Sequence, residues 1–291
     1  MIGVDWGTSS FRAYRLDAEG GILDRRNSAD GILAVQPGGF EEALRGHVGD
    51  WLAAGERRIL LCGMVGSRQG WVEAPYLACP ADAASIGAAL RRIPFDGAEV
   101  LLVPGLSDVD AEGTPEVMRG EETQIIGALA GVADAIACLP GSHSKWAQIS
   151  GGRIGGYRTY LSGETFSALR SGTILGRMMQ DGPTDPAAFS RGLARAAEPG
   201  HLLHHLFGVR SLALFGRLRE SETASYLSGL LIGHETLAAR PRGQDVHLIG
   251  AEALCALYAT AITHAGGTPI LHDADAAARG LARIGANAPW N

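Results

Sequence analysis

Residues 4–16, VDWGTSSFRAYRL, place one acidic residue, one glycine and three hydroxyl side chains between an apolar entry and a stretch that alternates like a strand. Consecutive backbone N–H groups in a glycine turn form an anion-binding nest, and Thr8, Ser9 and Ser10 add hydroxyl donors. Asp5, at the end of the entering strand, is the kind of single carboxylate that holds hydrated Mg²⁺ beside phosphates. The turn leads into a strand, which argues against a dinucleotide fingerprint or a P-loop because both enter a helix. A plain hairpin with a capping aspartate is the alternative.

The segment LPGSHSKW contains a weaker copy of this turn, about half a chain later. When Gly7 is aligned with Gly141, the further matched pairs are Thr8 and Ser142, Ser10 and Ser144, and Ala13 and Ala147. Both copies follow an apolar strand and precede another strand, which predicts a duplicated fold that holds one phosphate chain from two sides. Leu139 stands opposite Asp5, so only the first copy carries a carboxylate for a metal.

The rest of the chain alternates strand and helix patterns. Strands are expected at residues 2–5, 11–17, 58–63, 98–104, 135–140, 145–149, 155–161, 246–250 and 268–272. Helices are expected at residues 40–52, 252–266 and 273–285, with a mostly helical region at 164–239. No long Pro/Ser linker interrupts this pattern, which predicts an α/β protein whose lobes are closely joined.

The composition limits the partners of such a protein. The 291 residues are 46% hydrophobic and 19% charged, with a formal net charge of −6 and no basic run with interleaved aromatics, so we expect no nucleic-acid partner. The four cysteines are scattered and form neither a disulfide framework nor a zinc motif. No signal peptide or apolar membrane span is evident, so we expect no membrane partner and a cytoplasmic location.

Four segments in order resemble the actin/hexokinase superfamily of ATP-dependent phosphotransferases. IGVDWGTSSFR is similar to the first phosphate loop, MRGEETQIIGA to the linking helix, LPGSHSKW to the second phosphate loop and HLIGAEAL to the adenosine loop. Within the superfamily the chain resembles the 2-dehydro-3-deoxygalactonokinase family, on VDWGTSSFRA, LCGMVGSRQGW, APYL, VMRGEETQ, LPGSHSKW and LSGLLIGHE. One departure is Pro140, near a place where the second phosphate loop of the superfamily often begins with Asp.

This resemblance implies a two-lobed actin-like ATPase (ribonuclease H-like) fold, each lobe a mixed sheet flanked by helices, with ATP in the cleft. The expected lobes are residues 1–122, with the first phosphate loop and the sugar-acid side, and residues 123–291. The implied ATP-binding residues are Asp5, Gly7, Thr8, Ser9, Gly141, Ser142, His143, Gly250 and Ala251, with Asp5 also the ligand of Mg²⁺. Lys145, the only lysine, follows the second loop, and its role is open between a contact with ATP and packing in its own lobe.

Two adjacent acids in MRGEETQ are the candidates for the general base. Phosphoryl transfer needs an in-line arrangement, charge neutralisation and a carboxylate that takes the proton of the attacking hydroxyl. Glu121 and Glu122 follow Gly120 in the first turn of an expected helix. In related sugar kinases an acid after glycine at this point is the base, which points to Glu121. Glu122, or an acidic pair that only complements the helix dipole, are the alternatives.

The candidates for substrate contacts lie in loops. A 2-keto-3-deoxy sugar acid carries a carboxylate, which arginine binds well, and hydroxyls that need polar partners. The candidate residues are Trp6, Ser67, Arg68, Trp71 and Arg119. Either arginine could instead be a solvated surface residue, and the tryptophans could be packed in the core.

The resemblance implies ATP- and Mg²⁺-dependent phosphorylation of 2-dehydro-3-deoxy-D-galactonate to its 6-phosphate, in galactonate catabolism. A kinase for another sugar or sugar acid, such as the gluconate-derived epimer, is an alternative. A non-catalytic actin-like module that binds ATP is another, although such a switch does not require an acid beside an arginine at Gly120. Both a monomer and a homodimer are compatible with the sequence.

Overall fold

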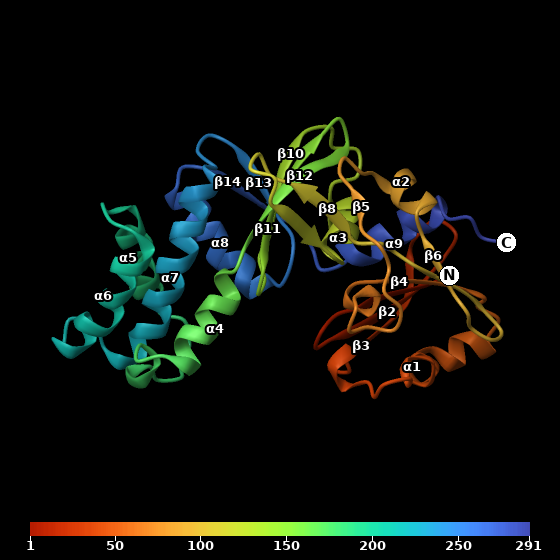
Figure 1. The fold of residues 1–291 in the computed structure, drawn as a ribbon, viewed down its shortest axis with the longest axis horizontal. Coiled ribbons are helices and arrows are strands. Elements are labelled where there is room, and N and C mark those ends of the chain that lie inside the picture. The colour runs from red at the N-terminus through yellow and green to blue at the C-terminus, as the bar shows by residue number, and fades with distance from the viewer. The chain divides into compact units, whose positions relative to one another are not determined.

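The computed structural model describes the whole chain, residues 1–291, as an α/β fold (Figure 1). The backbone contacts divide the chain into two compact units. The first unit comprises residues 1–134, 147–157 and 273–291, and the second comprises residues 135–146 and 158–272. The lobe boundary predicted between residues 122 and 123 falls inside the first unit, and the functional division into two lobes stays a prediction.

A six-stranded mixed sheet, of order β3-β2-β1-β4-β7-β6, lies in the first unit. Its strands are β1 (Ile2–Trp6), β2 (Phe11–Leu16), β3 (Ile22–Ser28), β4 (Arg58–Cys62), β6 (Arg91–Ile93) and β7 (Glu99–Leu102). β1 runs antiparallel to β2 and parallel to β4, which confirms the predicted leading hairpin. Helix α1 (Phe40–Ala53), expected at residues 40–52, buries one apolar face, formed by Phe40, Leu44, Val48 and Trp51.

A five-stranded sheet has the order β12-β11-β10-β13-β14. Its strands are β10 (Ala135–Leu139), β11 (Ser144–Ser150), β12 (Arg153–Tyr160), β13 (Asp245–Leu248) and β14 (Thr268–Leu271). In this sheet β13 is parallel to both of its neighbours, β10 and β14. In the six-stranded sheet β4 is likewise parallel to both of its neighbours, β1 and β7. The order of strands β3-β2-β1-β4-β7 is therefore repeated, as a duplicated fold predicts.

Several small elements were not expected from the sequence. They are β3, β6, α2 (Ala83–Ala88), and a three-stranded sheet of β5 (Leu77–Ala78), β8 (Leu106–Val109) and β9 (Pro115–Met118). β3 lies at the edge of its sheet, and most of its side chains are exposed. It therefore lacks the apolar alternation by which a strand is recognised. Three short 3₁₀ turns cover Ile32–Ala34, Met64–Gly66 and Gly176–Met178.

The remaining helices are α3 (Glu121–Ala128), α4 (Ser162–Gly172), α5 (Pro186–Ala197), α6 (Leu202–Leu214), α7 (Glu220–Ala239), α8 (Glu252–His264) and α9 (Ala276–Ala286). Helices α4 to α7 confirm the helical region predicted over residues 164–239.

The backbones of α3 and α9 are in direct contact, because a Cβ on Gly127 or on Gly280 would lie 1.9 Å from a carbonyl oxygen of the other helix. This close packing sets the position of α3, which begins with both candidate bases. None of the helices combines the length and apolar composition that a membrane span requires.

Candidate active site

The ends of β1 and β4 and the start of α3 meet at one edge of the six-stranded sheet. Asp5 is paired with Cys62 across the parallel strands β1 and β4. Gly63 follows β4 with φ +90°, and Gly120 precedes α3 with φ +107°. Both conformations favour glycine. A Cβ on Gly120 would lie 3.2 Å from the Cα of Gly63, so the two turns are in contact and bring the acids of α3 to the end of β4.

Asp5 is buried at this edge. Its Oδ2 accepts a hydrogen bond of 2.6 Å from Nη2 of Arg12, the residue opposite it on β2. Its Oδ1 accepts no hydrogen bond from the protein. Burial raises the pKa of the Asp5 carboxyl, and the charge of Arg12 acts in the opposite direction. The carboxylate is therefore held in one orientation with one oxygen left for another partner.

The two acids of α3 differ in their surroundings. Glu121 is half-buried, and its Oε2 accepts a bond of 3.0 Å from the backbone N–H of Arg119. Glu122 is fully buried, and its carboxyl oxygens bond the N–H of Gly120, at 2.7 Å, and the hydroxyl of Thr123, at 2.9 Å. Burial, together with the charge of Glu121, raises the pKa of Glu122 to about 8. Near neutral pH Glu122 is thus mostly protonated and out of contact with solvent.

This raised pKa predicts how stability depends on pH. Between the ordinary pKa of glutamate and about 8, the folded protein keeps a proton on Glu122 that the unfolded chain has lost. The free energy of unfolding should therefore fall as pH rises through this range, by about 1.4 kcal/mol for each unit by which the pKa is raised. Glu122→Gln removes the titration, so we expect its Tm, relative to that of the wild-type protein, to rise between about pH 5 and about pH 8 and then level off. Thermal unfolding of both proteins over this range tests it, and a constant difference in Tm would contradict it.

The two candidate arginines also differ. Arg68 is a surface residue, with a side chain 87% exposed and 3.5 Å from Glu73. Arg119 is 8% exposed, donates from Nη2 to the carbonyl of Ala74 at 2.8 Å, and lies over the ring of Tyr76. Its Nε and Nη1 are buried and have no hydrogen-bond partner. An unsatisfied buried guanidinium is costly unless an anion binds it.

The hydroxyl of Ser67 belongs to the same region. The Oγ of Ser67 is buried and has no hydrogen-bond partner. The residue before Ser67 is Gly66, and a Cβ added to Gly66 would lie 3.0 Å from Nη1 of Arg119. The structure thus brings Arg119 and Ser67 together and leaves Arg68 at the surface. Ala74 and Tyr76, which hold the guanidinium, lie in the APYL segment that contributes to the family resemblance, but nothing in their spacing marked them as site residues.

The two candidate tryptophans pack in the core of the first unit. Trp6 is fully buried, with its ring edge-on to Phe11 and its Nε1 bonded to the carbonyl of Asp30. Trp71 is half-buried and stacks on Phe40. The burial of Trp6 favours the packing alternative for this residue over direct contact with a sugar.

The first predicted phosphate loop, Gly7 to Ser10, is a turn between β1 and β2. Gly7 N–H donates to the carbonyl of Ser10 at 2.8 Å, while Thr8 and Ser9 are exposed. The backbone N–H groups of Thr8 and Ser9 donate to no acceptor in the protein, and neither do their hydroxyls. These donors are therefore available to an anion.

The second predicted loop, Pro140 to His143, lies between β10 and β11. Ser142 and His143 are exposed, and the backbone N–H groups of Gly141 and Ser142 have no acceptor in the protein. Gly250 has φ +150°, and a Cβ added to it would lie 3.6 Å from the carbonyl oxygen of Pro140. Gly250 and Ala251 therefore lie beside this loop. Lys145 is buried and donates to Thr159 Oγ1 at 2.9 Å.

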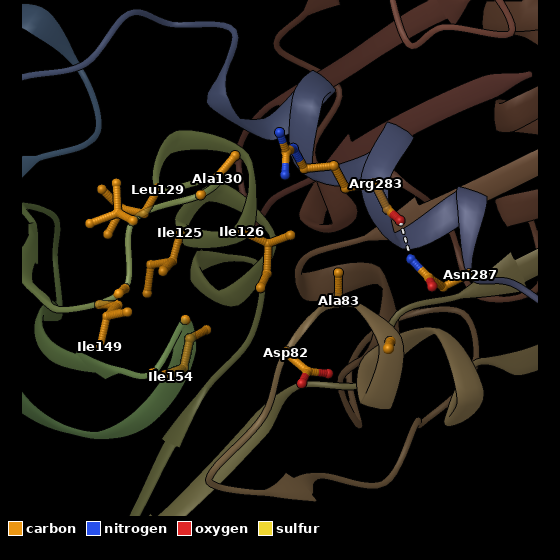
Figure 2. A pocket seen from close by; sticks show the side chains of 16 residues that line it. Asp82, Ala83, Ile125, Ile126, Leu129, Ala130, Ile149, Ile154, Arg283 and Asn287 are labelled. Carbon is orange, nitrogen blue, oxygen red and sulfur yellow. Dashed lines mark hydrogen bonds between the residues drawn. The ribbon is translucent and has the colours of Figure 1, made fainter.

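A separate cavity of about 490 Å³ lies between α2, α3, α9 and the turn from β11 to β12 (Figure 2). Figure 2 shows isoleucines of α3 and of the two strands on one side, and Arg283 of α9 and Asn287, directly after α9, on the other. No predicted site residue lines it. The chemistry-bearing side chains lie instead at the opposite end of α3.

Comparison with known proteins agrees with this arrangement. Residues 5–284 match the family described as 2-keto-3-deoxy-galactonokinase. The 2-dehydro-3-deoxygalactonokinase of Escherichia coli (strain K12) is 33% identical over 268 residues, which are 91% of this chain and 90% of that protein.

Solved structures agree as well. The crystal structure of a Sinorhizobium meliloti protein assigned to the 2-dehydro-3-deoxygalactonokinases is 37% identical and has a TM-score of 0.89, covering 98% of this chain and 97% of that one. An activator of the 2-hydroxyisocaproyl-CoA dehydratase from Clostridium difficile, solved with bound ADPNP, is 12% identical and has a TM-score of 0.50, over 99% of this chain and 95% of that one. The predicted actin-like ATPase fold is confirmed. The chain belongs to the 2-keto-3-deoxy-galactonokinase family, whose members are ATP-using sugar-acid kinases.

Proposed function

We propose that the protein transfers the γ-phosphoryl group of ATP to the terminal hydroxyl of 2-dehydro-3-deoxy-D-galactonate and forms the 6-phosphate, as a step of galactonate catabolism. The observation that carries the proposal is the buried guanidinium of Arg119, whose Nε and Nη1 have no partner, two residues before an acid at the start of α3. A kinase whose acceptor is a sugar acid needs both a cation for the carboxylate and a base for the hydroxyl.

Arg119 binds the carboxylate of the sugar acid in this proposal. Its position is already set by the carbonyl of Ala74 and the ring of Tyr76, so little side-chain entropy is lost when the substrate binds. The hydroxyl of Ser67, which has no partner, supplies a further donor beside it. Trp71 stays a predicted wall of the sugar site, while Arg68, exposed and near Glu73, is the weaker of the two arginines.

Glu121 is the proposed general base. It is half-buried, and the N–H of Arg119 orients its carboxylate. The oxygen of the terminal hydroxyl attacks the γ-phosphorus, its proton passes to the carboxylate of Glu121, and the bond from the γ-phosphorus to the bridging oxygen breaks to release ADP. Glu122 is less suited to this role because it is fully buried and its raised pKa leaves it protonated near neutral pH.

The donors for the phosphates come from the two turns. The exposed N–H groups and hydroxyls of Thr8 and Ser9, with Gly7, form the first proposed loop, and Gly141, Ser142 and His143 form the second. Gly250 and Ala251, beside the second loop, are the proposed contacts with adenosine. These roles rest on free donors in glycine turns, the arrangement that binds anions elsewhere.

Asp5 suits a magnesium ion that is held through few protein ligands. No group of three or more His, Cys, Asp or Glu side chains has an arrangement that could hold a metal ion by itself, so the remaining ligands of the ion would be water and phosphate oxygens. Asp5 offers Oδ1, since Arg12 binds only Oδ2. When bound there, Mg²⁺ neutralises charge on the phosphates.

The assay that tests the proposal measures ADP formation from ATP with 2-dehydro-3-deoxy-D-galactonate, with its gluconate-derived epimer, or with no sugar acid. We expect ADP to form only when a sugar acid and Mg²⁺ are present, and activity to be lost when EDTA is added. The kcat/KM should be higher for the galactonate-derived acid than for its epimer. The ³¹P NMR spectrum of the product should show a phosphate ester on the terminal carbon. Equal ADP formation without sugar acid would contradict the proposal, and a higher kcat/KM for the epimer would favour the alternative substrate. Sedimentation of the same preparation distinguishes a monomer from a homodimer.

A further inference from the structure

A buried carboxyl group lies next to the second phosphate loop and has no role in the chemistry described so far. Glu235, on α7, is 3% exposed. Its Oε2 accepts from the hydroxyl of Tyr258, on α8, at 2.8 Å and from that of Ser144 at 3.2 Å, and its Oε1 accepts from Nε1 of Trp146 at 2.8 Å. Ser144 and Tyr258 are themselves 2.7 Å apart. Ser144 is the first residue of β11, directly after the loop.

The same carboxyl group also reaches the helix that contacts the loop from its other side. The side chain of Ser162, the first residue of α4, lies near enough to Glu235 to lower the pKa of its carboxyl group. The next residues of α4 lie against the loop, because Glu164 N–H donates to the carbonyl of Ser142 at 3.0 Å and a Cβ on Gly163 would lie 2.5 Å from the carbonyl of Gly141. The carboxylate of Glu164 contacts the ring of His143.

We propose that Glu235 is a positioning residue for the nucleotide: by binding Ser144, directly after the second loop, it fixes the loop so that the N–H groups of Gly141 and Ser142 meet the phosphates in a set orientation. The inference rests on the proposed function, in which this loop binds ATP. A loop held in advance pays less conformational entropy on binding, so the effect appears in nucleotide affinity.

The chemistry of the group suits this role. Three donors from two separate elements, β11 and α8, converge on two oxygens, which only a carboxyl group can accept at this site without reorganisation. Burial raises the pKa of Glu235, while the polar side chains around its carboxyl group oppose that shift. In Glu235→Gln the amide oxygen still accepts from Trp146, and the hydroxyls of Ser144 and Tyr258 can turn to accept from the amide nitrogen. In Glu235→Ala the buried N–H of Trp146 loses its acceptor.

The test compares Glu235→Ala and Glu235→Gln with Leu231→Ala, by calorimetric titration of each full-length protein with ADP and by thermal unfolding. Leu231 lies on the same helix, buried in the cluster of α5, α6 and α7, so its truncation costs stability without a contact to the loop. We expect the Kd for ADP to rise roughly 10-fold or more in Glu235→Ala and less than about 3-fold in Glu235→Gln. The Kd for ADP should be unchanged in Leu231→Ala, even where its Tm falls as far as that of Glu235→Ala. The KM for the sugar acid should be unchanged in all variants.

Tyr258→Phe and Ser144→Ala extend the test if Glu235→Ala does not fold. Each removes one hydroxyl from the network and keeps the rest of the side chain, and each should raise the Kd for ADP by a factor of about 3 to 10. Unchanged ADP affinity in Glu235→Ala, or in both hydroxyl variants, would overturn the proposal, and so would an equal loss of affinity in Leu231→Ala. Failure of the wild-type protein to bind ADP would instead refute the nucleotide role of the loop, which belongs to the proposed function.

Discussion

Replacement of Glu121 by glutamine is expected to lower kcat on the order of 10²- to 10⁴-fold, the usual effect of removing a general base. Glutamine keeps the size of the side chain, and its amide oxygen can still accept the bond from the N–H of Arg119. The Kd values for ATP and for the sugar acid should therefore stay near those of the wild-type protein. A role limited to the helix dipole would be worth only about 0.3 to 1 kcal/mol and would appear in Tm.

Glu122→Gln is the matched control, because it makes the same change one residue further along α3. Glu122 is fully buried and bonded to Gly120 and Thr123, so we expect its kcat to stay within about 10-fold of wild type. Steady-state rates of both variants decide the assignment. A large loss confined to Glu122→Gln would move the base by one residue, and a loss in neither would leave both acids structural.

Replacement of Arg119 by methionine is expected to raise the KM for the sugar acid roughly 100- to 1,000-fold, since hydrogen bonds to a charged partner contribute about 1.5 to 3 kcal/mol each. Methionine keeps much of the apolar stem that packs over Tyr76. The KM for ATP should change little, because the proposed nucleotide contacts lie elsewhere. Initial rates with each substrate varied in turn separate the two effects.

Arg68→Met is the control for this variant. Its side chain is 87% exposed, so its loss should leave both KM values within about 3-fold of wild type. If Arg68→Met had the larger effect on the sugar acid, the carboxylate would be bound at the surface loop. Tm measurements on both variants check that the loss in Arg119→Met is not a loss of folded protein.

Much of the framework was predictable from local sequence. The apolar alternation of β1 and β2 and the helical spacing of Phe40, Leu44 and Val48 are local patterns, and the structure contains both. The similarity between the turns at Gly7 and Gly141 predicted a duplication, which the repeated strand order supports. These features depend on residues close together in the chain, where periodicity is informative.

The choice between similar residues was not predictable. Glu121 and Glu122 are adjacent, and which of them faces inward depends on how α3 packs against α9 through Gly127 and Gly280. Arg68 and Arg119 both lie near glycines in loops, and tertiary contacts, among them those with Ala74 and Tyr76, bury only the second. Glu235 looks like a solvated charge in a helix, because its donors come from distant elements.

A crystal structure of the protein with bound 2-dehydro-3-deoxy-D-galactonate and ADP would test the central claim most directly. We expect the substrate carboxylate within hydrogen-bond distance of Nε or Nη1 of Arg119, and the terminal hydroxyl within that distance of the carboxylate of Glu121. A sugar acid bound with its carboxylate on another cation, or with its terminal hydroxyl away from Glu121, would contradict the account.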